Sequence, residues 1–230
     1  MNYKTPFKII TSPWKYFRVY ILKDNLDRTK GFFLYYLFKW NLKKSPKKIN
    51  LCGGSVNISN YFNVDICSQA NLTMDLDKRL LPFKNESADT VVCISAINYF
   101  SRERGHEIID DVFRILKVGG ITRFAIQDLK EICKKYINND EKFFFEKLPN
   151  GRDRYEGVTM ADKINSWFYG YKTHSNKTSQ YMYDFETLSL LFKEVGFKIV
   201  ERKEYRNSGI TDIEKIDNRP EQMFFLEAIK

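Results

Sequence analysis

The most restrictive feature of the sequence is a short apolar run that ends abruptly in two glycines, Ile49-Asn50-Leu51-Cys52-Gly53-Gly54. Eleven residues beyond Gly54, a second short apolar run ends in an acid, Asp65. Glycine lets a backbone turn tightly and approach a ligand closely. An acid at the tip of the next strand can accept hydrogen bonds from ribose hydroxyls. The two runs therefore predict a nucleoside-cofactor site, with Cys52 standing where such turns usually begin with glycine.

From residue 49 onward, short apolar runs alternate with amphipathic stretches, which is typical of an α/β sheet. The runs predict seven strands, at about 48–52, 61–65, 72–74, 89–95, 121–126, 197–204 and 222–229. The stretches between them predict helices at 103–117, 129–138 and 184–195, of which Gly119-Gly120 ends the first and Gly196 the last. The run at 89–95 is continuously apolar, as expected for a central parallel strand that is covered on both faces.

Residues 1–48 differ from the rest of the chain in charge and in aromatic content. They carry twelve Lys/Arg against two Asp/Glu, a net charge of +10, and twelve of the 36 aromatic residues, whereas the other 182 residues sum to −1. We expect a basic, aromatic helical extension ahead of a domain at 49–230. Two roles are equally favoured: a helical cover of that domain, or peripheral contact with an anionic membrane surface. Nucleic-acid binding ranks third, because the domain is near neutral and shows no RNA-binding module.

The composition of the chain indicates a folded protein of the reduced compartment. The four cysteines are scattered and lack the CxxC spacing of a zinc site, so we expect no metal and a cytoplasmic location, with the inner face of the membrane as an alternative. The N-terminal residues lack the apolar core and cleavage site of a secretory signal. The longest apolar run, 31–38, is too short to span a bilayer.

Seven motifs in the order seen here make the chain similar to a known family. They are Ile49–Gly54, Asn63-Val64-Asp65, Asp75-Leu76 with Leu81-Pro82-Phe83, Arg114–Gly120, Gln127-Asp128-Leu129, Gly196-Phe197 and Leu226–Lys230. Together they resemble a class I S-adenosylmethionine-dependent methyltransferase, and most closely a group of small bacterial methyltransferases linked with surface-polysaccharide biosynthesis. The resemblance covers about 49–230. It implies a Rossmann-like, seven-strand doubly wound sheet, mostly parallel with an antiparallel last strand, and S-adenosyl-L-methionine as the cofactor.

The resemblance also implies roles for individual residues. Cys52, Gly53 and Gly54 would pass close to the methionine part of the cofactor, and Asp65 would hold both ribose hydroxyls. Asp75 and Leu76 would lie beside the adenine. The residues that follow the fourth strand would flank the transferable methyl group, and they are Ser95, Ala96 and Asn98. For each of these positions the alternative is an ordinary turn or loop role, which is strongest for Asp75 and Asn98.

Two further residues are candidates for catalysis. Asp128 ends a strand on the ligand side, where it could help to deprotonate or position an acceptor, although an N-cap of the helix at 129–138 is equally favoured. His174 lies in the aromatic and polar stretch at 139–183, which we expect to be a lid or a substrate-binding insert. A histidine can serve as the base of an O-methyl transfer, but a structural or exposed histidine is the commoner case.

We therefore expect a methyltransferase that acts on an oxygen of a sugar or of a phosphate-bearing, nucleotide- or lipid-linked precursor of a surface glycan. The sequence departs from the bacterial group at Cys52, which replaces a glycine, at Val118 and Gln127, which each replace a proline, and at two further places that bear on catalysis. Ile97-Asn98-Tyr99 stands where that group often has Leu-Glu-His, and Ser179-Gln180 stands where it often has His-Lys. Two alternatives stay open: a non-catalytic cofactor-binding or scaffold protein, and a nicotinamide-dependent oxidoreductase, whose fuller GxGxxG motif is absent.

Overall fold

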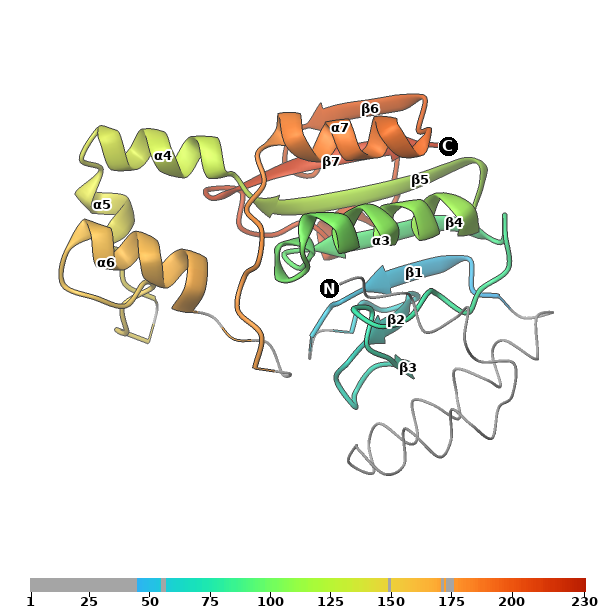
Figure 1. Ribbon diagram of the computed structural model, residues 1–230, viewed down its shortest axis with the longest axis horizontal. Helices are drawn as coiled ribbons and strands as arrows, with labels where there is room; N and C mark the ends of the chain where they lie inside the picture. Colours follow the sequence, from blue (N-terminus) through green and yellow to red (C-terminus); the bar gives the residue numbers. More distant parts are fainter. Residues whose placement is uncertain (1–44, 55–56, 149, 171, 173–175) are drawn as a thin grey trace.

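The computed structural model describes residues 45–54, 57–148, 150–170, 172 and 176–230. A seven-stranded sheet with the order β3-β2-β1-β4-β5-β7-β6 forms its centre (Figure 1). The strands are β1 (Lys48–Leu51), β2 (Phe62–Asp65), β3 (Leu72–Thr73), β4 (Ala88–Ile94), β5 (Leu116–Gln127), β6 (Ile199–Lys203) and β7 (Met223–Ile229). Neighbours from β3 to β5 are parallel, and β7 runs antiparallel to both β5 and β6. This topology confirms the expected Rossmann-like sheet with its antiparallel last strand.

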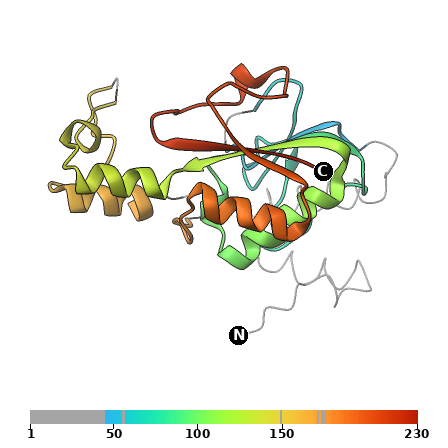
Figure 2. The ribbon, with the colours of Figure 1, turned by 90° about the horizontal axis from the view of Figure 1, so that it is seen from above.

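Two long helices cover one face of the sheet, α3 (Arg102–Ile115) and α7 (Phe185–Val195), which lie side by side (Figures 1 and 2). Ser101 caps α3, because its hydroxyl accepts from the backbone N–H of Arg104 at 3.2 Å. Asp184 caps α7 in the same way, and Gly196 ends that helix in the left-handed conformation that glycine adopts without strain. Alternate strand residues, such as Ile49 and Leu51 of β1, are buried against these helices.

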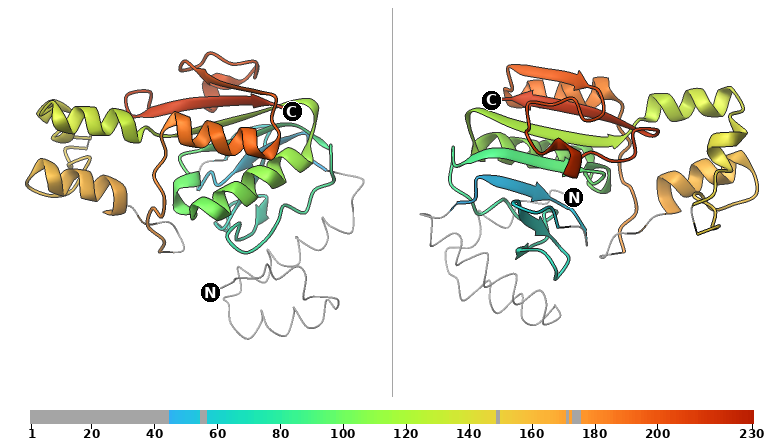
Figure 3. Two further views of the ribbon diagram at one scale, coloured as in Figure 1. Left: turned by 45° about the horizontal axis from the view of Figure 1, so that its top comes forward. Right: turned by 180° about the vertical axis from the view of Figure 1, so that it is seen from behind.

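The opposite face of the sheet is covered differently in the part of the chain described. The segment 204–222, with the short 3₁₀-helix η5 (Ile213–Lys215), crosses it, as the view from behind shows (Figure 3). Ile210, Ile213 and Ile216 of this segment pack on Val92 of β4 in a second apolar cluster. The segment matters for the site below, because it leads into β7 at the end of the sheet where ligands bind in open α/β folds.

The junction between α3 and β5 differs from its prediction. The expected helix at 103–117 ends at Ile115, and the expected glycine terminator is part of the strand. The pairing of β5 with β4 shifts register between Ala88 and Thr90, which accommodates the extra residues. Gly119, at φ +78°, donates its N–H to the carbonyl of Lys230 at 2.9 Å. The glycine pair thus lies in an irregular part of β5, and this part is hydrogen-bonded to Lys230.

The insert predicted at 139–183 contains more helix than its sequence pattern indicated. After α4 (Leu129–Ile137) come α5 (Glu141–Phe144), α6 (Met160–Asn165) and the π-helical turn η4 (Ser166–Gly170). They project beyond the carboxyl ends of the strands and have an apolar cluster of their own, around Phe144 and Trp167 (Figures 1 and 3). The missed signal was a capping box, in which Thr159 and Asp162 each accept from the other's backbone N–H.

The expected helical extension lies outside the described residues, apart from the last four of its 48 positions. Its predicted contacts with the domain or with an anionic membrane therefore stay predictions. Among the residues that the structure describes, no helix is long and apolar enough to cross a bilayer.

Candidate cofactor site

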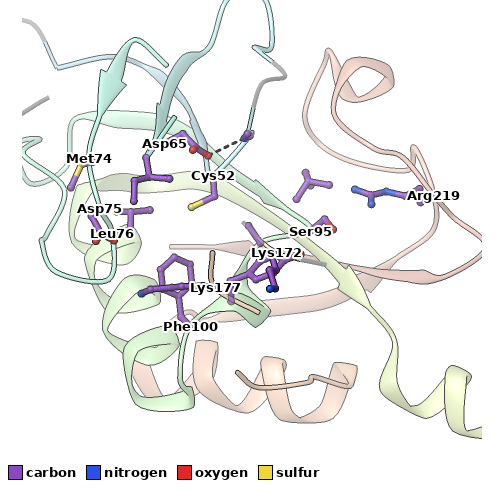
Figure 4. Close-up of a pocket in the computed structure, with 16 residues that line it drawn as sticks. Cys52, Asp65, Met74, Asp75, Leu76, Ser95, Phe100, Lys172, Lys177 and Arg219 are labelled. Atoms are coloured by element: carbon purple, nitrogen blue, oxygen red, sulfur yellow. Dashed lines mark hydrogen bonds between the residues drawn. The ribbon is translucent and has the colours of Figure 1, made fainter. Parts of the chain in front are cut away.

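The glycine turn after β1 is hydrogen-bonded to a carboxylate at the end of the next strand. The backbone N–H of Cys52 donates to the carbonyl of Val64 at 2.8 Å, so the turn begins directly at the end of the β1–β2 ladder. The N–H of Gly54 then donates to Asp65 Oδ2 at 2.9 Å (Figure 4). The other oxygen of Asp65 accepts from the N–H of Cys67 at 2.8 Å. One buried acid therefore shapes the turns that follow both β1 and β2.

The residues after β3 form the next wall of the site. The backbone N–H of Met74 donates to the carbonyl of Asp65 at 2.8 Å, which places this segment against the β2 turn. Asp75 accepts from the N–H of Asp77 at 3.1 Å and pairs with Lys78 at 3.3 Å. Arg104 of α3 donates from Nε to the carbonyl of Leu76 at 2.7 Å. The wall thus presents the acid of Asp75 next to the apolar side chains of Met74 and Leu76.

The residues after β4 complete the floor. The N–H of Ser95 donates to the carbonyl of Ala125 at 2.7 Å, and Ser95 Oγ accepts from Gln127 Nε2 at 3.1 Å. Because Gln127 donates, the hydroxyl proton of Ser95 is available to donate to another acceptor. Ser95 itself adopts a left-handed backbone, with φ +59°.

These walls enclose a cavity of about 400 Å³ at the carboxyl ends of the parallel strands (Figure 4). Eight of the predicted cofactor residues line it together: Cys52, Gly53, Gly54, Asp65, Asp75, Leu76, Ser95 and Ala96. They come from four strand ends that are up to 44 positions apart in the sequence. A volume of this order suits a small molecule or cofactor.

The cavity has further lining residues that the sequence did not indicate. They include Tyr99, Phe100, Lys172, Lys177 and Arg219. Phe100 follows the short 3₁₀-helix η3 (Ile97–Tyr99), and Lys177 forms an ion pair with Asp77. No local pattern marks these side chains, because they reach the cavity from separate segments.

Several residues that line this cavity have a strained backbone. Three of its side-chain-bearing residues have a left-handed φ: Cys52 at +57°, Ser95 at +59° and Arg219 at +51°. This conformation costs a non-glycine residue roughly 1–2 kcal/mol. Strained backbone of this kind tends to persist where function requires a particular geometry. Cys52 therefore occupies the first position of the turn at the cost of a strained backbone.

The thiol of Cys52 is not activated as a nucleophile. Burial raises its pKa well above the ordinary value, with smaller contributions from Cys93, Asp65 and Asp75. Burial likewise raises the pKa of Cys93 to about 12. Both thiols are therefore protonated near neutral pH, and thiolate catalysis is not the chemistry of this cavity.

Replacing Cys52 by glycine should stabilise the protein slightly and preserve binding of the demethylated cofactor. Glycine removes the conformational penalty of the left-handed backbone, which is about 1–2 kcal/mol. Its greater freedom in the unfolded chain lowers the stability by about 0.5–1 kcal/mol, so a small gain remains. Chemical denaturation and calorimetry with S-adenosylhomocysteine measure the two effects. Cys133→Gly, in the right-handed helix α4, is the control and should lower stability. A large loss of affinity in Cys52→Gly would show that the cysteine side chain itself contacts the ligand.

Asn98 lies beside the cavity and does not line it. Its side-chain nitrogen donates to Ser179 Oγ at 2.7 Å. Its backbone carbonyl accepts from the backbone N–H groups of Gln180 and Tyr181. Asn98 thus holds the segment around 179–181 against the end of β4. Its predicted contact with the cofactor stays a prediction.

Asp128 is the N-cap of α4, as the alternative interpretation of its position predicts. One carboxylate oxygen accepts from the N–H groups of Lys130 and Glu131, and the other pairs with Arg202 at 2.9 Å. Its side chain is buried and does not line the cavity. The structure therefore shows the capping role of Asp128, and its proposed part in catalysis stays a prediction. The second catalytic candidate, His174, lies outside the described residues.

Asp128→Ala is expected to lower stability by about 1–2 kcal/mol, chiefly through the lost cap, and to change methyl transfer little at a temperature where the variant is folded. Thermal unfolding and a transfer assay report the two effects. Asp184→Ala is the matched control, because Asp184 caps α7 in the same way and also lies outside the cavity lining. If Asp128→Ala lost methyl transfer but kept its stability, and Asp184→Ala kept its methyl transfer, Asp128 would have a catalytic role.

Comparison with known proteins shows which class of protein the segment around this site resembles. Residues 48–124 match the family model described as a methyltransferase domain. The match runs from β1 into β5 and includes every predicted cofactor-binding residue. The Rossmann-like sheet expected from the sequence is confirmed by the topology, and the match supports a methyltransferase domain over residues 48–124. A search of curated protein sequences gives no match.

Solved structures of methyltransferases are among those similar to this chain. An S-adenosylmethionine-dependent methyltransferase from Thermotoga maritima shows 16% identity over 89% of this chain and 96% of its own, with a TM-score of 0.44. One from Archaeoglobus fulgidus shows 15% identity over 85% and 94% of the two chains, with a TM-score of 0.44. A phosphoethanolamine N-methyltransferase from Haemonchus contortus, in complex with S-adenosyl-L-methionine, shows 11% identity over 86% and 52%, with a TM-score of 0.44.

The cofactor that the methyltransferase match supports is S-adenosyl-L-methionine, and the cavity suits it chemically. Asp65 presents a carboxylate that can accept hydrogen bonds from ribose hydroxyls in addition to its two backbone donors. Met74 and Leu76 offer apolar surface for a purine, and Asp75 offers an acceptor for its exocyclic amine.

Proposed function

We propose that this protein transfers a methyl group from S-adenosyl-L-methionine to an oxygen of a sugar or of a phosphate-bearing precursor of a surface glycan. The observation that carries the transferase reaction is the meeting of eight predicted cofactor residues in one cavity, within the segment that matches a methyltransferase domain. The glycan acceptor is supported by the sequence resemblance to bacterial enzymes of polysaccharide biosynthesis.

The charge of the cavity supports an anionic acceptor. Lys172 and Lys177 line it together with the cofactor residues. Lys177 pairs with Asp77, whereas Lys172 is a second cation near the positive sulfonium of the donor and favours an anionic group in the acceptor. A phosphate or diphosphate on the acceptor is such an anionic group. Nucleotide-linked and lipid-linked sugars both carry such groups.

The transfer itself requires little acid–base chemistry from the protein. The cofactor supplies an already activated methyl group when it is bound. The protein's task is to hold the acceptor oxygen in line with the carbon–sulfur bond and to exclude water. Ser95 can orient that oxygen through its hydroxyl, which Gln127 holds in place. His174 remains our candidate for the base that removes the acceptor's proton, on the sequence argument alone.

Calorimetry tests the proposal at its first step. We expect micromolar binding of S-adenosylhomocysteine and none of NADH. Binding of NADH alone would support an oxidoreductase, and binding of neither would support a scaffold protein. A transfer assay with methyl-labelled donor against nucleotide-linked sugars, lipid-linked sugars and amine acceptors then tests the acceptor. Methylation of amines only would contradict the proposed O-methylation.

The basic extension adds a separate proposal, that residues 1–48 contact anionic membranes where lipid-linked precursors are found. The support is their net charge of +10 and their twelve aromatic residues. Flotation of the full chain with vesicles containing anionic lipid, compared with neutral vesicles, tests it. Absence of binding to anionic vesicles at physiological salt would remove the proposal.

A further inference from the structure

The connection between β1 and β2 lacks an element that sites of this kind commonly use. A Gly-rich turn is often followed by a helix, whose N-terminal N–H groups and dipole bind an anionic part of the ligand. Here only the ten residues 52–61 separate the two strands, and those that the structure describes, 52–54 and 57–61, contain no helix. An anionic group bound beside this turn must therefore find its partners elsewhere in the cavity.

The two ends of the cavity differ in their chemistry (Figure 4). At one end lie Met74, Asp75 and Leu76, and Asp65 lies between them and the glycine turn. At the opposite end, beyond Ser95, lies Arg219, with its guanidinium directed toward the cavity. An elongated ligand with its purine at Leu76 and its ribose at Asp65 extends its remaining part toward the Ser95 and Arg219 end.

Arg219 is exposed, and local contacts together with the anchoring of its segment limit its position. It has a left-handed φ of +51°, and its Nε donates to Asn218 Oδ1 at 2.9 Å. Two residues earlier, Asp217 forms a buried ion pair with Arg123 of β5 at 2.6 Å, which fixes the segment to the sheet. A guanidinium held in this way suits a carboxylate, because its planar N–H groups can make two parallel hydrogen bonds.

We propose that Arg219 binds the α-carboxylate of the methyl donor, in place of the helix N-terminus that the described residues after the glycine turn do not provide. The inference rests on the proposed function, which places S-adenosyl-L-methionine in this cavity. It adds a donor-binding residue from the segment before β7, far in sequence from the matched domain at 48–124. It also gives a physical reason for the strained backbone at Arg219, because that conformation directs the side chain inward.

A pair of ligands tests the proposal by calorimetry. S-adenosylhomocysteine carries the amino-acid carboxylate, and 5′-methylthioadenosine has the same nucleoside without it. Arg219→Gln should weaken binding of the first by about 10- to 100-fold, the usual range for one lost charge-assisted interaction. Binding of the second should change by less than about 3-fold, and Arg219→Lys should recover part of the loss.

A second cation of the cavity provides the matched control. Lys172→Gln removes this cation and should leave the preference for S-adenosylhomocysteine intact. Loss of that preference in Lys172→Gln instead of Arg219→Gln would overturn the proposal. Equal weakening of both ligands in Arg219→Gln would also overturn it, because it would indicate a structural role.

An anionic acceptor is the remaining alternative for Arg219, and pyrophosphate serves as its probe. If Arg219→Gln weakens pyrophosphate binding and leaves S-adenosylhomocysteine unaffected, the arginine serves the acceptor and the proposal is wrong. If the wild-type protein binds neither nucleoside ligand, the proposed function fails, which is a result distinct from failure of the Arg219 assignment.

Discussion

Asp65→Ala should abolish useful binding of the methyl donor, with a loss of S-adenosylhomocysteine affinity of about 100-fold or more. Each hydrogen bond from a ribose hydroxyl to this carboxylate is worth about 1.5–3 kcal/mol, and two are lost together. The variant also removes the acceptor for the N–H of Gly54 and of Cys67, so the turns after β1 and β2 lose their common support. Calorimetry with the purified variant measures the change in affinity.

A ligand-side control separates contact with the ribose from collapse of the turns. The wild-type protein should discriminate strongly against the 2′-deoxy analogue of S-adenosylhomocysteine, and Asp65→Ala should bind both ligands equally weakly. Asp75→Asn is the matched variant in the same cavity and should have a smaller effect, because the aspartate contacts at most one amine of the purine. Unchanged affinity in Asp65→Ala would refute the cofactor site as drawn.

The strand ends of this site could be predicted because their signals are local. Each predicted cofactor residue follows a short apolar run, and parallel strands bring their carboxyl ends to one edge of a sheet. Cys52 and Asp65 were therefore assigned from the sequence, and both line the cavity. The cap of α4 was predictable for the same reason, since Asp128 directly precedes that helix and accepts from backbone N–H groups within its first turn.

The features that escaped prediction depend on contacts between distant segments. Gly119-Gly120 has the pattern of a helix terminator, yet the pair belongs to β5 because Lys230 provides hydrogen-bond partners from the other end of the domain. Arg219 lies in a segment without strand or helix pattern, so nothing local associates it with the cavity. The lack of a helix after the glycine turn was equally hidden, since a glycine turn has the same sequence pattern with or without one.

The second large effect is expected outside the cavity lining, at Arg123 on the face of the sheet opposite α3 and α7. The side chains of Arg123 and Asp217 are both fully buried, and they are joined by two hydrogen bonds of 2.8 and 2.6 Å. Arg123 also donates to the carbonyls of Glu204 and Asn207 at 3.1 Å. Arg123 also pairs with the buried Glu227 at 3.4 Å, so Arg123→Met removes the cation from two buried carboxylates, which should cost about 3–5 kcal/mol of stability. Denaturant unfolding measures this loss.

Two further variants test whether the unpaired charge is the cause. Adding Asp217→Asn to Arg123→Met removes the more buried of the two carboxylates that lose Arg123 and should recover part of the stability. Lys130→Met breaks an ion pair with Glu186 in which both side chains are mostly exposed, and it should barely alter unfolding. If Arg123→Met were as harmless as Lys130→Met, the buried pair would not hold the segment 204–222 to the sheet.

Arg123→Met should also affect ligand binding, because the ion pair of Arg123 anchors the segment that carries Arg219. Arg219 lies two residues beyond Asp217, so a segment released from Arg123 no longer presents the guanidinium at a fixed position. Arg123→Met, measured at a temperature where it is still folded, should therefore lose part of the preference for S-adenosylhomocysteine over 5′-methylthioadenosine although Arg123 does not line the cavity. A variant that is destabilised by the expected amount but retains the full preference would show that the cavity end at Arg219 is held by contacts other than this ion pair.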